Sequence, residues 1–168
     1  ALHCMGYRFD HPIVRKQVRE LEKLEVEEQD TLRVQPCFSP VWDTALAMNA
    51  LVESGIPDSD PAIQRGAEWV LDKRGNSAGD WMVKNRHTTN PGWFFEYANP
   101  YYPDNDTTAM VLTALSKVKL PDADREAQRR QRIREAHEWH LSMQNTDGGW
   151  SAFDKDCDKE FLCHVPFA

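Results

Sequence analysis

Long apolar runs, a surplus of basic residues and paired cysteines are all missing from this 168-residue sequence. No apolar run approaches the roughly 20 residues that a membrane-spanning helix needs, and no basic-then-apolar leader opens the chain. The net charge of -7 argues against a protein that binds the phosphate backbone of nucleic acids. The composition that remains, with 40% hydrophobic and 28% charged residues, is that of an ordinary globular domain.

The four cysteines form no C-x-x-C pair and give little reason to expect a metal centre. Cys157 and Cys163 lie near His164, but this spacing fits no usual zinc pattern. Free thiols in a cytosolic protein are the expected state. We therefore predict neither a metal site nor a cofactor.

The chain contains an internal repeat with an offset of 64 residues. Asp43–Leu51, followed by Pro57, aligns with Thr107–Leu115, followed by Pro121. Apolar residues recur at helical spacing in both segments, and we expect each proline to stop its helix. Helices that cannot bury their apolar faces alone are typical of stacked arrays.

Each unit continues into a second helical stretch that closes on glycine and tryptophan. These stretches are Arg65–Trp81 and Arg134–Trp150. We predict that the four tryptophans within them are structural, and that Gln144 and Asp147 cap nearby backbone groups. The sequence predicts an all-α array of helix pairs, either an open solenoid or a closed α/α toroid.

Two further segments stand apart from the repeat. Val14–Leu24 predicts an amphipathic helix, and Thr31–Val34 predicts a short extended stretch. Between the units, residues 82–105 form a long connection rich in aromatic residues. A loop of that length is usually functional or disordered, and its aromatic content argues against disorder.

Several motifs resemble those of the squalene-hopene cyclases, which are class II triterpene cyclases. Arg134–Trp150 resembles the QW repeat of terpene cyclases, and Arg65–Trp81 resembles it more loosely. Ser39–Ala45 is similar to the opening of an inner barrel helix in that family. Tyr101–Ala109 resembles the D-x-D-D acid motif with its flanks. The resemblance covers essentially the whole chain.

This resemblance implies helix pairs that form part of an α6-α6 toroid of the terpenoid cyclase type. Residues 1–36 would be the tail of the second α-barrel domain, and residues 37–168 would be part of the catalytic α/α barrel. The start at Ala1 and the end at Ala168, just after an apolar-aromatic stretch, also favour an internal segment of a longer protein.

By the same resemblance, Asp106 occupies the position of the family's proton donor. A helix start stabilises the anion that such an acid leaves behind. Asp104, two residues earlier, would supply the like charge that keeps the pair partly protonated. From pattern alone, Asp106 is an ordinary helix N-cap and Asp104 an ordinary turn residue after Pro103, and both alternatives stay open.

One position departs from the family pattern. Squalene cyclases have an aspartate where this chain has Thr107, and oxidosqualene cyclases have a cysteine there. We keep squalene as the first expectation. Oxidosqualene or another polyprenoid is the alternative, because an epoxide is easier to protonate than an unactivated alkene.

Aromatic side chains are the expected walls of the cavity. Trp42, Phe95 and Phe153 match family positions that line it, and Phe94 and Tyr102 are further candidates. Ring faces attract cations, so such walls stabilise carbocations as fixed electrostatic elements. Because Trp42 holds the place in the first repeat that Asp106 holds in the second, we expect both to face the same side. Core packing is the alternative for any single ring.

The resemblance therefore implies protonation-initiated polycyclisation of squalene to hopene-type triterpenes, with Asp106 as the general acid. A non-catalytic helical-repeat module that binds lipid or peptide is the alternative of another class, and a prenyltransferase-like toroid would need zinc ligands that the sequence offers poorly. Relatives hold a histidine near the acid that would lie beyond Ala168. His137 and His140 are expected at the surface, so we expect this segment alone to be inactive.

The expected partner is a hydrophobic polyprene, with no nucleic acid. Family members dock on membranes, so we expect the full-length parent to be a peripheral protein on the cytoplasmic side. The sequence leaves open whether it forms a homodimer.

Overall fold

The computed structural model describes residues 2, 4–35, 37–76, 78–86, 88 and 90–157. The chain divides into two units, Ala1–Phe38 and Ser39–Ala168. None of the helices in the described residues combines the length and the apolar composition of a membrane span.

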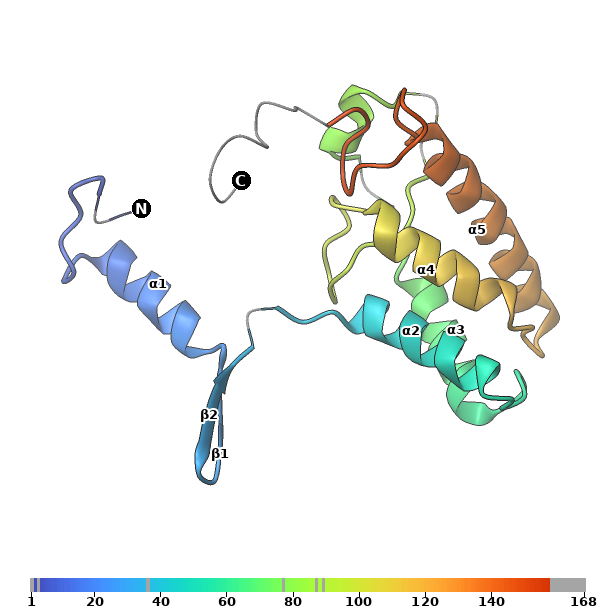
Figure 1. Ribbon diagram of the computed structural model, residues 1–168, viewed down its shortest axis with the longest axis horizontal. Coiled ribbons are helices and arrows are strands. Elements are labelled where there is room, and N and C mark those ends of the chain that lie inside the picture. The colour runs from blue at the N-terminus through green and yellow to red at the C-terminus, as the bar shows by residue number, and fades with distance from the viewer. Residues whose placement is uncertain are drawn as a thin grey trace. The chain divides into compact units, whose positions relative to one another are not determined.

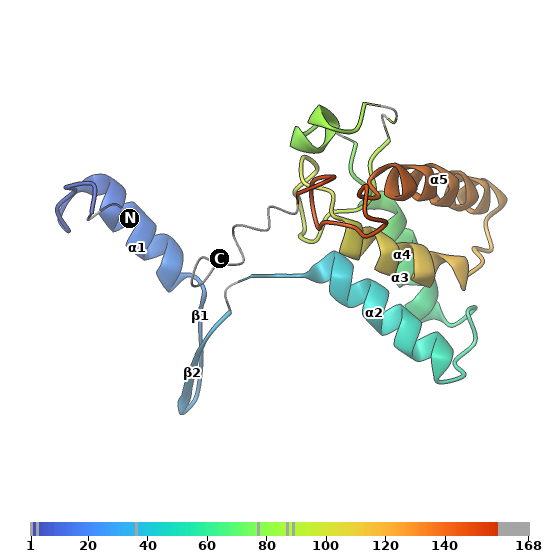
Figure 2. The ribbon, with the colours of Figure 1, turned by 45° about the horizontal axis from the view of Figure 1, so that its top comes forward.

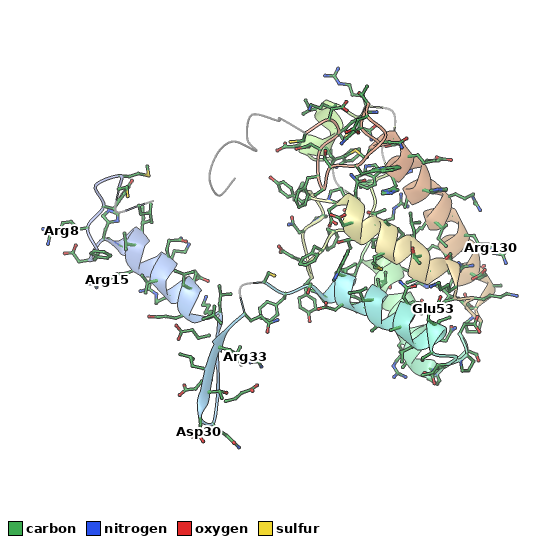
Figure 3. All side chains as sticks on the ribbon, in the orientation of Figure 1. Arg8, Arg15, Asp30, Arg33, Glu53 and Arg130 are labelled. Carbon is green, nitrogen blue, oxygen red and sulfur yellow. The ribbon has the colours of Figure 1, made fainter. Side chains whose placement is uncertain are left out.

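The first unit holds one helix and a β-hairpin. Helix α1 (Pro12–Glu22) is followed by strands β1 (Glu25–Glu28) and β2 (Thr31–Val34), which pair antiparallel. The predicted helix and the predicted extended stretch are confirmed, although β1 was not predicted. The ion pair between Arg33 and Glu28 crosses the hairpin at 2.9 Å, and the side chain of Arg33 projects from β2 (Figure 3).

The second unit is built from helix pairs, as the repeat predicts. Helices α2 and α4, which carry the repeated segments, lie side by side, while α3 packs on α2 and α5 packs on α4 (Figures 1 and 2). The elements are α2 (Pro40–Glu53), α3 (Pro61–Asp72), the short 3-10 helix η1 (Asp80–Val83), α4 (Asn105–Ser116) and α5 (Ala123–Ser142). The all-α prediction is confirmed for this unit.

Carboxylates and glycine set the helix boundaries here. Asp60 and Asp122 accept hydrogen bonds from the first turns of α3 and α5, both at 2.8 Å. Helix α2 already ends at Glu53, because Gly55 turns the chain in the left-handed region with φ of +91°. Pro57 and Pro121 therefore lie in the turns beyond the helices, and the prediction that they stop the helices is wrong.

One apolar core joins the four helices. Each helix contributes its buried face at helical spacing, which confirms the periodicity predicted for α2 and α4. The fully buried members include Val41, Ala45, Ile63, Ala67, Val70, Val111, Leu115 and Ala136.

The long connection folds back onto this core through Trp93, which is fully buried. Its backbone N–H donates to Thr108 Oγ1 at 2.9 Å, and its indole N–H donates to the Val70 carbonyl at 2.8 Å. Trp93 thereby attaches the connection to α3 and α4 at once, and this attachment places the residues that follow it.

The tryptophans that close the repeats are structural, as predicted. Trp81 and Trp139 pack edge to face with ring centroids 5.9 Å apart. The Trp150 indole N–H donates to the His140 carbonyl at 2.7 Å. In the same turn Gln144 Nε2 donates to the Gly148 carbonyl at 2.7 Å, and Asp147 Oδ1 accepts from the Gly149 N–H at 2.8 Å. The Trp150 bond fastens the end of α5 to the following loop, and the other two bonds lie within that loop.

The close contact of the connection with α4 predicts that Gly92→Ala destabilises the protein. A methyl group at this position would lie 2.0 Å from Thr108 Oγ1 and 2.9 Å from Thr108 Cβ, so the loop and the helix must separate. Overpacking of this kind costs about 1–3 kcal/mol, and we expect thermal unfolding of the full-length protein to shift down by several degrees.

Gly66→Ala is the matched control for that variant. Its added methyl group would meet Met48 Sδ at 3.1 Å, which is part of a flexible side chain, and alanine favours a helix interior over glycine by up to about 1 kcal/mol. We expect a thermal midpoint close to that of the wild type. Equal midpoints for the two variants would contradict the proposed packing of Gly92.

Candidate functional site

A pocket of about 420 Å³ lies at the N-terminal ends of α2 and α4. The connection before α4 and the loop after α5 complete its walls. The lining residues are Trp42, Phe95, Glu96, Asn99, Tyr102, Asp104, Asp106, Thr107, Ala152 and Phe153. The structure thus brings six of the seven predicted site residues to one pocket.

Phe94 is the predicted site residue that does not line this pocket. Its side chain is buried, with 5% of its surface exposed, while the adjacent Phe95 faces the pocket. This placement favours core packing for Phe94, which was the alternative for every aromatic residue in the set.

The repeat explains why Trp42 and Asp106 meet at the pocket. Each residue lies in the first turn of its helix, α2 or α4, and the two helices pack side by side. Equivalent positions of two such helices face the same side, so the prediction that Trp42 and Asp106 share a side is confirmed.

Asp104 is the N-cap of α4. Its Oδ1 accepts from the Thr107 N–H at 2.7 Å, and its own N–H donates to the Trp93 carbonyl at 3.0 Å. The residue is buried, with 4% of its surface exposed. Asp104 therefore takes the capping role that the pattern alone offered to Asp106, and the reading of Asp104 as a solvated turn residue is wrong.

Burial raises the pKa of the Asp104 carboxyl, and the nearby charge of Asp106 raises it further. The hydrogen bond from the Thr107 N–H acts in the opposite direction. Asp104 Oδ2 is buried without a hydrogen-bond partner in the described part of the chain. A buried, singly bonded carboxyl of this kind favours its protonated form.

Asp106 lies two residues farther along, in the first turn of α4, and its side chain is exposed. The positive end of the helix dipole stabilises a negative charge at this place. The two carboxyls of the motif thus have different environments: Asp104 is buried, and Asp106 is open to the pocket.

Thr107 completes the pocket beside these carboxyls. It is fully buried, and within the described residues its Oγ1 has no hydrogen-bond partner. The site therefore holds a hydroxyl where the squalene-cyclase pattern has a third carboxyl.

Aromatic rings form the apolar walls. The rings of Trp42 and Phe95 lie 6.3 Å apart, centroid to centroid, at an angle of 42°. Tyr102 and Phe153 are about half exposed and line the same pocket. A ring face attracts a cation by roughly 0.5–2 kcal/mol, so several aromatic rings around one pocket suit a cationic intermediate.

Glu96 and Asn99 also line the pocket, and the sequence reasoning missed them. Both lie in the connection of residues 82–105 that is predicted to be functional, among its aromatic residues. Their place in that connection was the available signal, but in a sequence a glutamate or an asparagine in a loop resembles any solvated residue.

No group of three metal-binding side chains (His, Cys, Asp or Glu) comes together among the described residues. Cys4, Cys37 and Cys157 are exposed free thiols. Cys163 and His164 lie outside the described residues.

Comparison with known proteins gives one consistent result. The family model for the squalene-hopene cyclase C-terminal domain matches residues 38–168. A dammaradiene synthase of Dryopteris crassirhizoma is 42% identical over 168 residues, which cover 100% of this chain and 24% of that protein. A squalene-hopene cyclase of Alicyclobacillus acidocaldarius is 40% identical over 133 residues, 79% of this chain and 21% of that protein.

A squalene-hopene cyclase of Schizosaccharomyces japonicus is 37% identical, over 98% of this chain and 26% of that protein. The chain therefore spans about a quarter of the length of these relatives.

The raised pKa of Asp104 predicts how its replacement changes stability with pH. Because the folded state holds this proton more tightly than the unfolded state, the folded protein loses stability as the pH rises from the ordinary Asp value of 3.8 through the raised folded value. Asp104→Asn keeps the cap and removes this loss of stability. We therefore expect the thermal midpoint of the variant minus that of the wild type to be larger at pH 7 than at pH 4.

Asp104→Ala serves as the comparison, because it removes the cap as well as the charge and should cost about 1 kcal/mol at low pH. Thermal unfolding of the full-length protein at both pH values measures the effect. A difference between Asp104→Asn and wild type that does not change with pH would show that the carboxyl titrates as an ordinary aspartate.

Proposed function

Because this chain belongs to the squalene-hopene cyclase C-terminal domain family, we propose that it is the acid-bearing part of a triterpene cyclase. The proposed reaction is protonation-initiated polycyclisation of squalene to hopene-type products. The observation that supports this most directly is the pocket in which Asp104 and Asp106 meet the rings of Trp42, Phe95 and Phe153.

In the proposed first step, Asp106 protonates the terminal double bond of the polyene. The π electrons form the new C–H bond, the O–H bond of the carboxyl breaks, and a tertiary cation and the Asp106 carboxylate result. Internal double bonds then attack in turn, each forming a C–C bond and moving the cation along the chain. The sequence ends when the last cation gives a proton to water and forms a double bond, or when it adds water and the added water gives up a proton to solvent. A proton from solvent then restores the Asp106 carboxyl. Proton transfer from a placed side chain typically contributes 10²–10⁴-fold to a rate.

The other pocket residues have distinct parts in this scheme. Burial raises the pKa of Asp104, so the carboxyl beside Asp106 holds its proton more tightly than an ordinary aspartate does. The helix dipole of α4 stabilises the carboxylate that Asp106 becomes. The rings of Trp42, Phe95, Tyr102 and Phe153 line the pocket in which the cation would move, and their π electrons stabilise it without forming a bond to it.

Thr107 gives a specific reason to keep oxidosqualene as a second candidate substrate. The site offers two motif carboxyls and a hydroxyl, and an epoxide oxygen accepts a proton more readily than an alkene carbon. The same Asp106 would then protonate the epoxide, and the ring would open to the same kind of tertiary cation.

Replacement of the proposed acid tests the function. The full-length protein and its Asp106→Asn variant are incubated with squalene and with oxidosqualene, and cyclic products are measured by gas chromatography with mass detection. We expect product from the wild type and a loss of about a hundredfold or more in the variant.

Asp124→Asn is the matched control, since Asp124 is an exposed aspartate in the first turn of α5. It should retain full activity. Equal product from wild type and Asp106→Asn would remove Asp106 as the acid, and no product from either substrate in the wild type would remove the cyclase proposal for these substrates.

Thr107→Asp tests what the missing carboxyl does. We expect the ratio of squalene to oxidosqualene turnover to rise, because the third carboxyl restores the pattern of squalene cyclases. Thr107→Asn has nearly the same shape without the charge and should leave the ratio near that of the wild type. The two ratios come from competition assays with both substrates, and an unchanged ratio in Thr107→Asp would show that this position does not select the substrate.

A further inference from the structure

Asn105 stands between Asp104 and Asp106, and it connects the acid-bearing turn to two other elements. Its N–H donates to the Ala152 carbonyl at 2.8 Å, and its Nδ2 donates to the Ser151 carbonyl at 2.6 Å. Its Oδ1 lies 3.1 Å from His140 Nδ1. The side chain is buried, with 2% of the residue surface exposed. One residue thus links α4, α5 and the loop that carries Phe153.

This network assigns the proton on His140. The bond to the Ser151 carbonyl requires the amide nitrogen of Asn105 on that side, so the amide oxygen faces the imidazole. An amide oxygen only accepts hydrogen bonds, and therefore His140 Nδ1 carries the proton and donates it. The assignment follows from the partners on both sides of the amide.

His140 is itself held in place. Its ring stacks on the Trp150 ring with centroids 5.2 Å apart and planes within 6°. The indole N–H of Trp150 donates to the His140 carbonyl. The side chain is half-buried, so the prediction of a surface histidine on α5 is wrong for His140, while His137 is exposed.

We propose that His140 and Asn105 are positioning residues. They hold the first turn of α4, which carries Asp106, at a fixed place relative to Phe153, which lines the same pocket. This inference rests on the proposed cyclase function. Asp104 and Asp106 flank Asn105 in the chain, while Ala152, whose carbonyl Asn105 binds, precedes Phe153. A shift of Asn105 therefore moves the acid and the aromatic wall relative to each other, and a misplacement of about 1 Å can cost up to about a hundredfold in rate.

The charges around His140 suit this role. Burial lowers the pKa of its imidazole, and the charge of His137 lowers it further, while Asp106 acts in the opposite direction. The imidazole is therefore neutral at neutral pH, where it has a single N–H, and the network directs that N–H to Asn105. Another side chain that donates a hydrogen bond to Asn105 from the same place should therefore serve as well as histidine.

The first test separates positioning from packing in the full-length enzyme. His140→Leu removes the donor, while His140→Asn keeps an N–H near the place of Nδ1. We expect kcat to fall about tenfold in His140→Leu, with KM nearly unchanged, and to recover in His140→Asn. His137→Leu, an exposed change on the same helix, should behave as the wild type.

A double variant shows whether His140 acts through Asn105. Asn105→Val removes the amide, so adding His140→Leu to it should cause no further loss of kcat. If His140 acted only by packing on Trp150, the losses of the two single variants would multiply in the double variant. Multiplied losses, or no recovery in His140→Asn, would overturn the proposal.

A second measurement needs no activity and keeps the two proposals apart. Hydrogen–deuterium exchange of the full-length protein should quicken in His140→Leu for peptides that contain residues 104–107 and 151–153, and it should not change at the start of α2. If this change occurs in a protein that makes no cyclic product, the positioning stands and the cyclase proposal fails. If product forms and exchange is unchanged, the positioning fails and the cyclase proposal stands.

Discussion

The capping of α4 by Asp104 is the interaction on which the pocket depends. Its carboxyl accepts the Thr107 N–H, its own N–H is held by the Trp93 carbonyl, and the Trp93 N–H is held by Thr108. Together these three bonds cap the start of α4 and hold the connection of residues 82–105 against it. Without them, neither the direction of Asp106 nor the position of Phe95 would be defined, since both follow from this junction.

This junction carries a cost that an ordinary helix start avoids. A cap can be exposed, and an exposed aspartate caps well, but Asp104 is buried with one oxygen unbonded in the described structure. Burying a polar group without a partner is unfavourable, and proteins tend to break such local rules at functional sites. The raised pKa of Asp104 and the exposure of the Asp106 side chain have one cause. Both residues lie at the start of α4, which is covered on one side and open to the pocket on the other.

Much of this arrangement could be predicted from the sequence, and the failures have physical causes. The repeat predicted the helix pairs and the common side of Trp42 and Asp106, because equivalent positions of packed helices face alike. The strand β1 was missed because Glu25–Glu28 is mostly glutamate, which is depleted in strands. Which aspartate caps α4 could not be decided, since both are good capping residues and only burial separates them.

The contact between Asn105 and His140 could not be predicted from the sequence. They are 35 residues apart in the chain, and an asparagine at a helix start and a histidine on a polar helix both resemble ordinary surface residues. Their meeting depends on the packing of α5 against α4, and the bond from the Trp150 indole to the His140 carbonyl ties this turn of α5 to the following loop. With Thr107 in place of a third carboxyl, the proposed acid Asp106 would depend on elements that the motif does not include. The dipole of α4, which stabilises a carboxylate at Asp106, and the turn held by Asn105 are the elements that this chain offers. Only the first of them can be recognised in the order of the residues.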